Sequence, residues 1–178
     1  MKAGSGKGKG GAFERKICKA LSLWVTHGDR DDVFWRSAMS GGRATVRRKK
    51  GKSTQTQVGD ISPVDAVGQP FIDIYVVECK HYNKLDIESA VIQGNGKLVE
   101  FWDKLVIEAK GCNKLPMLIA KQNNRPVLVC VCKRSIKTVL RSYRLLEHKF
   151  SINHKGTTKM FVCQLDELVG TTCRVTKK

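Results

Sequence analysis

The sequence is short of acidic side chains. It has 16 Asp and Glu residues against 33 Lys and Arg residues in 178 positions, which leaves a formal net charge of +17. A chain with so large an excess repels itself unless a polyanion screens it, and nucleic acid is the usual partner of such chains. The composition therefore predicts nucleic-acid binding. The alternatives are a general affinity for polyanions and a charge that only keeps the chain in solution.

Long apolar runs and paired zinc-binding cysteine motifs are also missing. No segment approaches the roughly 20 apolar residues of a membrane-spanning helix, and no apolar run after Met1 resembles a signal peptide. We therefore expect a protein without membrane association that is not secreted and is cytoplasmic, in a host cell if it is encoded by a mobile element. Cys79, Cys130 and Cys163 stand in apolar, strand-like stretches, so we expect small buried residues in a reducing compartment rather than ligands of structural zinc.

The length fits one domain preceded by a short basic segment. Residues 1–11 contain five glycines and three lysines, which predicts a flexible basic arm with Lys7 and Lys9 available to phosphates. Residues 12–178 are expected to form a single domain.

Hydrophobic periodicity and turn residues predict a mixed α/β fold. We expect helices over 12–25, 87–93, 97–110, 135–146 and 166–169, and strands over 33–39, 59–61, 71–79, 115–120, 126–131 and 159–163. This order predicts a mixed central sheet flanked by helices. Trp24, Trp35 and Trp102 are expected in the core.

A second basic segment lies between the first two predicted strands. Residues 43–52, RATVRRKKGK, hold six cations and cannot bury themselves, so we expect a mobile loop or an extended hairpin. Such a segment could hold phosphates, although many charged runs are only solvated loops.

An acidic and a basic residue lie at the end of the strand predicted over 71–79: Glu78 is within it and Lys80 directly follows it. Glu78 and Lys80 are two residues apart, so they point to the same side of a strand and Cys79 points to the other. A surface ion pair is one reading of this pattern. The other is phosphodiester hydrolysis, in which Asp60 and Glu78 hold Mg2+ through hard oxygen ligands while Lys80 orients or deprotonates a water or stabilises charge on the phosphate.

The spacing resembles the PD-(D/E)XK nuclease superfamily. Gly59-Asp60-Ile61 is followed seventeen residues later by Glu78-Cys79-Lys80, with a Glu-bearing helix upstream. Within that superfamily the chain looks most like the Holliday-junction resolvases of archaea and phages. The likeness covers residues 7–82 and rests on Glu14, Ser40-Gly41, Asp60, Glu78 and Lys80.

The resemblance implies a restriction-endonuclease-like fold and a role for each matched residue. Asp60, Glu78 and the carbonyl of Cys79 would be metal ligands, Lys80 the catalytic lysine, and Glu14 an auxiliary acid. Magnesium would be the cofactor, with Mn2+ able to replace it. Ser37 or Ser40 could contact the phosphate near the scissile bond.

The same reading places DNA along the basic segments. The expected DNA contacts are Lys7, Lys9, Ser40, Arg43, Arg47, Arg48, Lys49, Lys50, Lys121 and Arg125. Phosphate contacts position a substrate without reading its sequence, so we expect recognition of branched or junction DNA by shape. The resemblance also implies a homodimer, which would match the two-fold symmetry of a four-way junction.

Two features depart from the family pattern. The proline of the family name is Gly59 here, and the interval from Asp60 to Glu78 is long for a resolvase. Asp65 is therefore a rival ligand, although it follows Pro63 in an expected loop, whereas Asp60 leads into a strand. Asp73 lies five residues before Glu78, on the opposite side of the predicted strand, and is expected to be structural.

Three functions remain open from the sequence. The first is a structure-selective DNA endonuclease, and the second is a restriction- or repair-type nuclease that acts on duplex DNA. The third is a nucleic-acid-binding protein without catalytic activity.

Overall fold

The computed structural model describes residues 5–37, 58–136, 151–152, 159–171 and 173. The helices are α1 (Ser5–Val25), η1 (Ala66–Gly68), α3 (Gln69–Ile74), α4 (Ile87–Gln93), α5 (Lys97–Gly111), α6 (Lys133–Ser135) and α8 (Leu165–Val169). The strands are β1 (Phe34–Arg36), β2 (Ile61–Pro63), β3 (Tyr75–Tyr82), β4 (Leu115–Gln122), β5 (Val127–Cys132), β6 (Ser151–Ile152) and β7 (Met160–Gln164).

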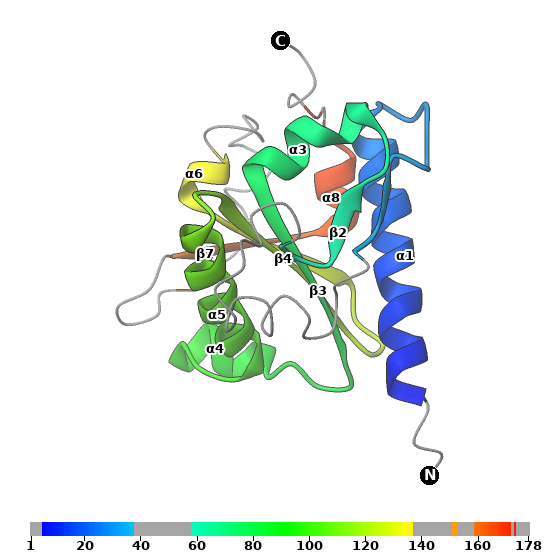
Figure 1. Cartoon of the computed structure of the whole chain (residues 1–178). Coiled ribbons are helices and arrows are strands. Elements are labelled where there is room, and N and C mark those ends of the chain that lie inside the picture. Colours follow the sequence, from blue (N-terminus) through cyan, green and yellow to red (C-terminus); the bar gives the residue numbers. More distant parts are fainter. Residues whose placement is uncertain (1–4, 38–57, 137–150, 153–158, 172, 174–178) are drawn as a thin grey trace, which may run out of the picture.

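The main sheet is mixed. Its strand order is β3-β4-β5-β7-β6, in which β3 and β4 are parallel and the other neighbours are antiparallel. A parallel pair needs a crossover, and α4 and α5 provide it between β3 and β4. β1 and β2 form a separate antiparallel pair, which lies between α1 and β3 in Figure 1.

Two apolar cores cover the two faces of this sheet. α1 and α8 pack on one face, around Ile17, Leu21 and Leu168, and α5 packs on the other through Trp102 and Leu105. The predicted mixed sheet flanked by helices is thereby confirmed. None of the helices in the described part of the chain has the length and apolar composition that crossing a membrane requires.

The alternation of β3 between the two cores sets the direction of its polar end. Val77 and Cys79 belong to the core on the α1 side, whereas Val76 belongs to the core on the α5 side. Glu78 and Lys80 follow Val76 in this alternation, and the Nζ of Lys80 lies 5.8 Å from the centre of the Phe101 ring on α5. The strand therefore directs both side chains toward the α5 face.

The first helix begins earlier than predicted. α1 starts at Ser5, so residues 5–11 of the expected flexible arm are helical, although glycine is a poor helix former. Two tertiary contacts offset that cost: Lys9 bonds to Asn123, and the missing side chain of Gly11 makes room for the guanidinium of Arg36.

The prediction of a strand over 71–79 is wrong for its first half. Residues 69–74 form α3, and β3 begins only at Tyr75. Pro70 stands in the first turn of α3, where its fixed φ and missing N–H cost nothing. Phe71 and Ile72 are the buried residues of this helix. The apolar run contains a helix and a strand in succession, which periodicity alone does not separate.

Other differences concern shorter elements. β1 covers residues 34–36 of the predicted 33–39, and the predicted helix over 135–146 lies almost wholly outside the described residues. Trp24 and Trp102 are buried as predicted, but Trp35 is 53% exposed. The expectation for Trp35 was wrong because Phe34 takes the inward position of this short strand and leaves its neighbour outward.

Candidate active site

The three predicted catalytic side chains meet at the free edge of β3. The backbone N–H of Asp60 donates to the Val77 carbonyl at 2.8 Å, and Asp60 Oδ2 accepts the N–H of Cys79 at 2.8 Å. The ammonium of Lys80 forms an ion pair with Glu78 and lies 4.0 Å from Asp60 Oδ2. Two carboxylates from separate parts of the chain thus flank one ammonium.

A glycine brings Asp60 to this edge. Gly59 has φ +90°, and a Cβ there would lie 2.7 Å from the Val77 carbonyl oxygen. Only a residue without a side chain can come so close to β3 in this conformation. The carbonyl of Asp60 in turn accepts the Ser37 N–H at 2.8 Å, which ties the site to the end of β1.

The site has two acidic side chains, Asp60 and Glu78, and one basic side chain, Lys80. Burial, and next the charge of Glu78, raise the pKa of Asp60 to about 7. Burial alone would lower the pKa of Lys80, but the charges of Glu78 and Asp60 and the hydrogen bond to Glu78 raise it above its ordinary value. One ammonium does not fully neutralise the two carboxylates at neutral pH.

The available donors are hard oxygen atoms, which suit Mg2+ or Mn2+ rather than a soft metal. Among the described residues, no group of three or more His, Cys, Asp and Glu side chains is placed to hold a metal, so the side chains contribute two carboxylates. Burial raises the pKa of the Cys79 thiol well above its usual value, and the thiol lies in the opposite core. Because N–H and C=O of one strand residue face the same edge, the Cys79 carbonyl faces Asp60.

Comparison with known protein families gives a match. The model of the family described as "Phage putative PDDEXK endonuclease" matches residues 5–177. The chain belongs to this family. No curated protein and no solved structure matches it.

Membership makes the chain a nuclease of the PD-(D/E)XK superfamily, the superfamily predicted from the sequence. The closer resemblance to junction resolvases stays a prediction. Nucleases of this superfamily generally use divalent metals, which is consistent with the charge deficit between Asp60 and Glu78.

Glu14 of this nuclease is engaged by an arginine. Arg36 Nε donates to Glu14 Oε2 at 2.8 Å, and the Glu14 side chain is 13% exposed. The charge of Glu14 acts on Asp60, but Glu14 does not join the two carboxylates in one cluster. Its part as an auxiliary acid stays a prediction. Arg36 was missed from the sequence because no local pattern links residues 22 positions apart.

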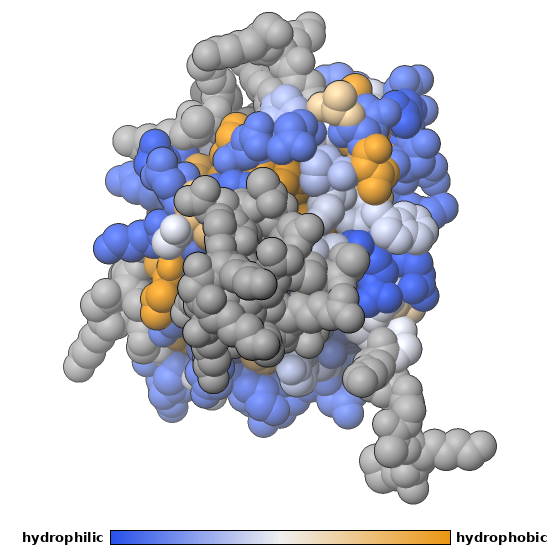
Figure 2. Space-filling view, viewed as in Figure 1, coloured by the Kyte–Doolittle hydropathy of each residue, from blue (hydrophilic) through white to orange (hydrophobic). Residues whose placement is uncertain are grey.

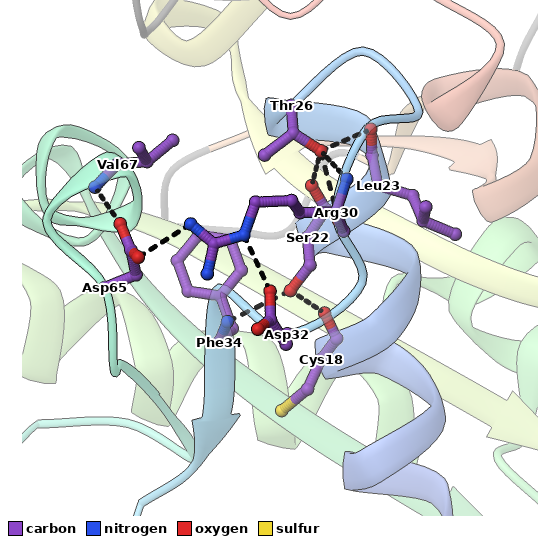
Figure 3. Close-up of polar contacts among 9 residues, drawn as sticks. All are labelled: Cys18, Ser22, Leu23, Thr26, Arg30, Asp32, Phe34, Asp65 and Val67. Atoms are coloured by element: carbon purple, nitrogen blue, oxygen red, sulfur yellow. Dashed lines mark hydrogen bonds and ion pairs between the residues drawn. The ribbon is translucent and has the colours of Figure 1, made fainter.

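The rival ligand Asp65 is held elsewhere in the nuclease (Figure 3). Its Oδ2 accepts from Arg30 Nη1 at 2.7 Å, and its Oδ1 accepts from the Val67 N–H at 2.9 Å, which caps η1. Arg30 also bonds to Asp32 at 2.9 Å. Asp73 is exposed on α3 and accepts a hydrogen bond from Gln69.

Few of the predicted DNA contacts lie in the described residues. Ser40, Arg43, Arg47, Arg48, Lys49 and Lys50 lie outside them, and Lys7 lies in α1. Lys9 Nζ bonds to Asn123 Oδ1 at 2.8 Å, and Lys121 Nζ donates to the carbonyl of Arg125 at 2.5 Å. Lys9, Lys121 and Arg125 therefore gather around the β4–β5 hairpin, beside the end of β3.

Hydrophilic residues cover much of the described surface on one face of the molecule (Figure 2). Figure 2 shows them over most of the coloured surface on the face viewed, with apolar residues confined to small patches. A cleft of about 680 Å³ also opens beside Lys80, between the start of α1 and the end of β3.

Proposed function

We propose that the chain is a magnesium-dependent endonuclease that hydrolyses phosphodiester bonds in DNA. The observation that carries the proposal is the meeting of Asp60, Glu78 and Lys80 at one strand edge, where burial raises the pKa of the Asp60 carboxyl. A carboxylate pair with so little compensating charge is suited to a divalent cation. The chain's +17 charge supports a polyanionic substrate.

Asp60, Glu78 and the carbonyl of Cys79 would hold the cation. The bound cation would polarise the phosphate and lower the pKa of an attacking water. The Cys79 N–H fixes the orientation of the Asp60 carboxylate, since it occupies Oδ2 at 2.8 Å. This hydrogen bond keeps the ligand in place before any substrate arrives.

Lys80 stays protonated in this arrangement because its two acidic neighbours raise its pKa. We therefore assign it to orienting the water and stabilising charge on the phosphate, rather than to removing a proton. Glu14 is the proposed auxiliary acid beside these residues. Arg36 orients the Glu14 carboxylate through its hydrogen bond.

The test is cleavage of plasmid and oligonucleotide DNA with Mg2+ or Mn2+. Glu78→Gln and Lys80→Ala should each lower the cleavage rate by at least about a hundredfold, the scale of losing one preorganised charged group, while DNA affinity stays nearly constant. Asp73→Asn, an exposed acid on α3, serves as the matched control and should cleave like the wild type. A wild type that cuts no DNA with either metal would leave the non-catalytic binding function in place.

We further propose that the preferred substrate is branched DNA and that the active form is a two-fold dimer. The family resemblance in residues 7–82 supports both points. Cleavage of a four-way junction should exceed cleavage of a linear duplex of the same arms, and sedimentation should give twice the chain mass. Equal rates on both substrates would favour the restriction- or repair-type function.

A further inference from the structure

The strand that carries the catalytic residues continues one step past them. Tyr82 follows Glu78 and Lys80 on the same face of β3, about 7 Å beyond Lys80, which is comparable with one nucleotide of an extended strand. The Tyr82 side chain stands at the rim of the cleft and is 40% exposed. An aromatic ring at this position has no part in the chemistry described so far.

Tyr82 is supported from behind and flanked by charge. Its ring centre lies 5.1 Å from that of Phe101, whose own ring lies under the Nζ of Lys80 at 5.8 Å. The Nζ of Lys97 lies 5.8 Å from the Tyr82 ring centre. The two rings therefore form an aromatic surface between the ammonium groups of Lys80 and Lys97.

The cleft itself suits a phosphate backbone. It is lined by Lys9, Lys80, Lys84 and Lys97 with Tyr82 between them, and none of the described residues that line it is acidic. Lys84 has only one described acidic neighbour, Asp86 at 3.5 Å, and its side chain is 80% exposed. Lysines that surround an exposed aromatic ring are the combination that binds single-stranded nucleic acid.

We propose that Tyr82 stacks on an unpaired base next to the scissile phosphate while Lys84 and Lys97 hold the neighbouring phosphates. The inference rests on the proposed function, because it takes Lys80 as the catalytic lysine. A base inside a duplex is already stacked on both faces, so only an unpaired base can lie on Tyr82. The cleft thus selects DNA that is opened beside the cut, as at a branch, a bulge or a frayed end.

Lys97 does not prevent this stacking. Its contact with the Tyr82 ring lies near the outer limit of a cation–π interaction, and its side chain is exposed at the start of α5. A lysine on a flexible stem can leave the ring for a phosphate at little cost. The base would then lie on the Tyr82 ring, and the phosphate would take the ammonium of Lys97.

The first test measures binding without divalent metal, so that it is independent of catalysis. Fluorescence anisotropy compares fluorescein-labelled oligothymidylate with a duplex of equal length. Tyr82→Ala and Tyr82→Leu should weaken single-strand binding by about five- to a hundredfold, the value of one base stacked on an aromatic ring. Tyr82→Phe should bind single strands like the wild type. The affinity of Tyr82→Ala and Tyr82→Leu for the duplex should change much less than their affinity for single strands. Ile107→Ala, another exposed apolar side chain, is the control.

The second test measures cleavage of two duplexes that differ only in one unpaired nucleotide. The wild type should cut faster beside the unpaired nucleotide, and in Tyr82→Ala the ratio of the two rates should fall toward one. Equal losses of single-strand and duplex binding would assign Tyr82 to packing on Phe101 and overturn the inference. So would unchanged single-strand binding in Tyr82→Ala. Failure of the proposed function would instead appear as no cleavage by the wild type, with the binding comparison still decisive for Tyr82.

Discussion

The backbone at Gly59 determines where the Asp60 carboxylate lies. Its φ of +90° and the 2.7 Å approach of a notional Cβ to the Val77 carbonyl both require glycine. The proline of the family pattern would fix φ near −65°, which is incompatible with this approach to β3. The departure at this position is therefore part of how the chain builds its site.

Gly59→Ala should damage both folding and metal binding. Strain at positive φ and the close contact should lower the free energy of unfolding by about 1–3 kcal/mol and displace Asp60. Gly28→Ala is the matched control, since Gly28 has φ +94° but open space where its Cβ would stand. Urea unfolding and Mn2+ titration of both variants separate strain from displacement. Equal Mn2+ affinity in the two variants would contradict this account of Gly59.

The Asp60 carboxyl should also make stability depend on pH. A carboxyl whose pKa rises from its ordinary 3.8 to about 7 on folding binds more protons in the folded chain, so its contribution falls as pH rises between these values. Asp60→Asn keeps an oxygen for the Cys79 N–H but cannot ionise.

In EDTA, Asp60→Asn should therefore be more stable than the wild type. The difference should grow from about pH 4 to pH 7, reach about 4 kcal/mol at about 1.4 kcal/mol per pKa unit, and level off above pH 7. Thermal unfolding across this range measures it, with Asp73→Asn as the control. A wild type that becomes more stable than Asp60→Asn as pH rises would show that the sign is wrong.

At the scale of elements, the structure separates two acids that the sequence left in competition. Asp60 leads directly into β2 and bonds to β3, whereas Asp65 caps η1 and pairs with Arg30 (Figure 3). We therefore expect Asp65 to have a local, structural role.

Asp65→Ala should lower stability and leave cleavage intact. Loss of the cap should cost about 1 kcal/mol, and the half-exposed pair with Arg30 should add little. Thermal unfolding and a cleavage assay on the same preparation check both points, with Asp31→Ala as a control for loss of an exposed ion pair. A loss of cleavage comparable to that of Glu78→Gln would make Asp65 the ligand after all.

The sequence predicted which side chains lie together better than it predicted the elements around them. The two-residue period of a strand fixes Glu78 and Lys80 on one face wherever the strand begins, so their pairing survived the error at residues 71–74. That error arose because the apolar residues Phe71, Ile72 and Ile74 suit a short buried helix as well as a strand. The bond between Glu14 and Arg36 depends on tertiary packing alone and left no signal in the sequence.

At the scale of the whole molecule, charge should dominate DNA affinity. With a net charge of +17, contacts to about six phosphates predict a slope near −5 for log affinity against log salt concentration. Lys121→Ala at the β4–β5 hairpin should reduce that slope by about one.

Lys110→Ala is the control for this measurement. Lys110 is exposed at the end of α5 that leads into the start of β4, at the opposite end of the sheet from Lys80. Its removal should leave the slope unchanged. Anisotropy titrations of one duplex across several salt concentrations give all three slopes, and identical slopes for the two variants would exclude the hairpin from the DNA interface.

The central claim is that Asp60 and Glu78 together hold a divalent cation against the substrate phosphate. The most direct test is a crystal structure of the protein soaked in Mn2+, with anomalous diffraction to locate the ion. The account predicts an anomalous peak within bonding distance of both carboxylates and of the Cys79 carbonyl, with Lys80 moved off Glu78. A peak at Asp65, or no peak between residues 60 and 78 at saturating Mn2+, would contradict it.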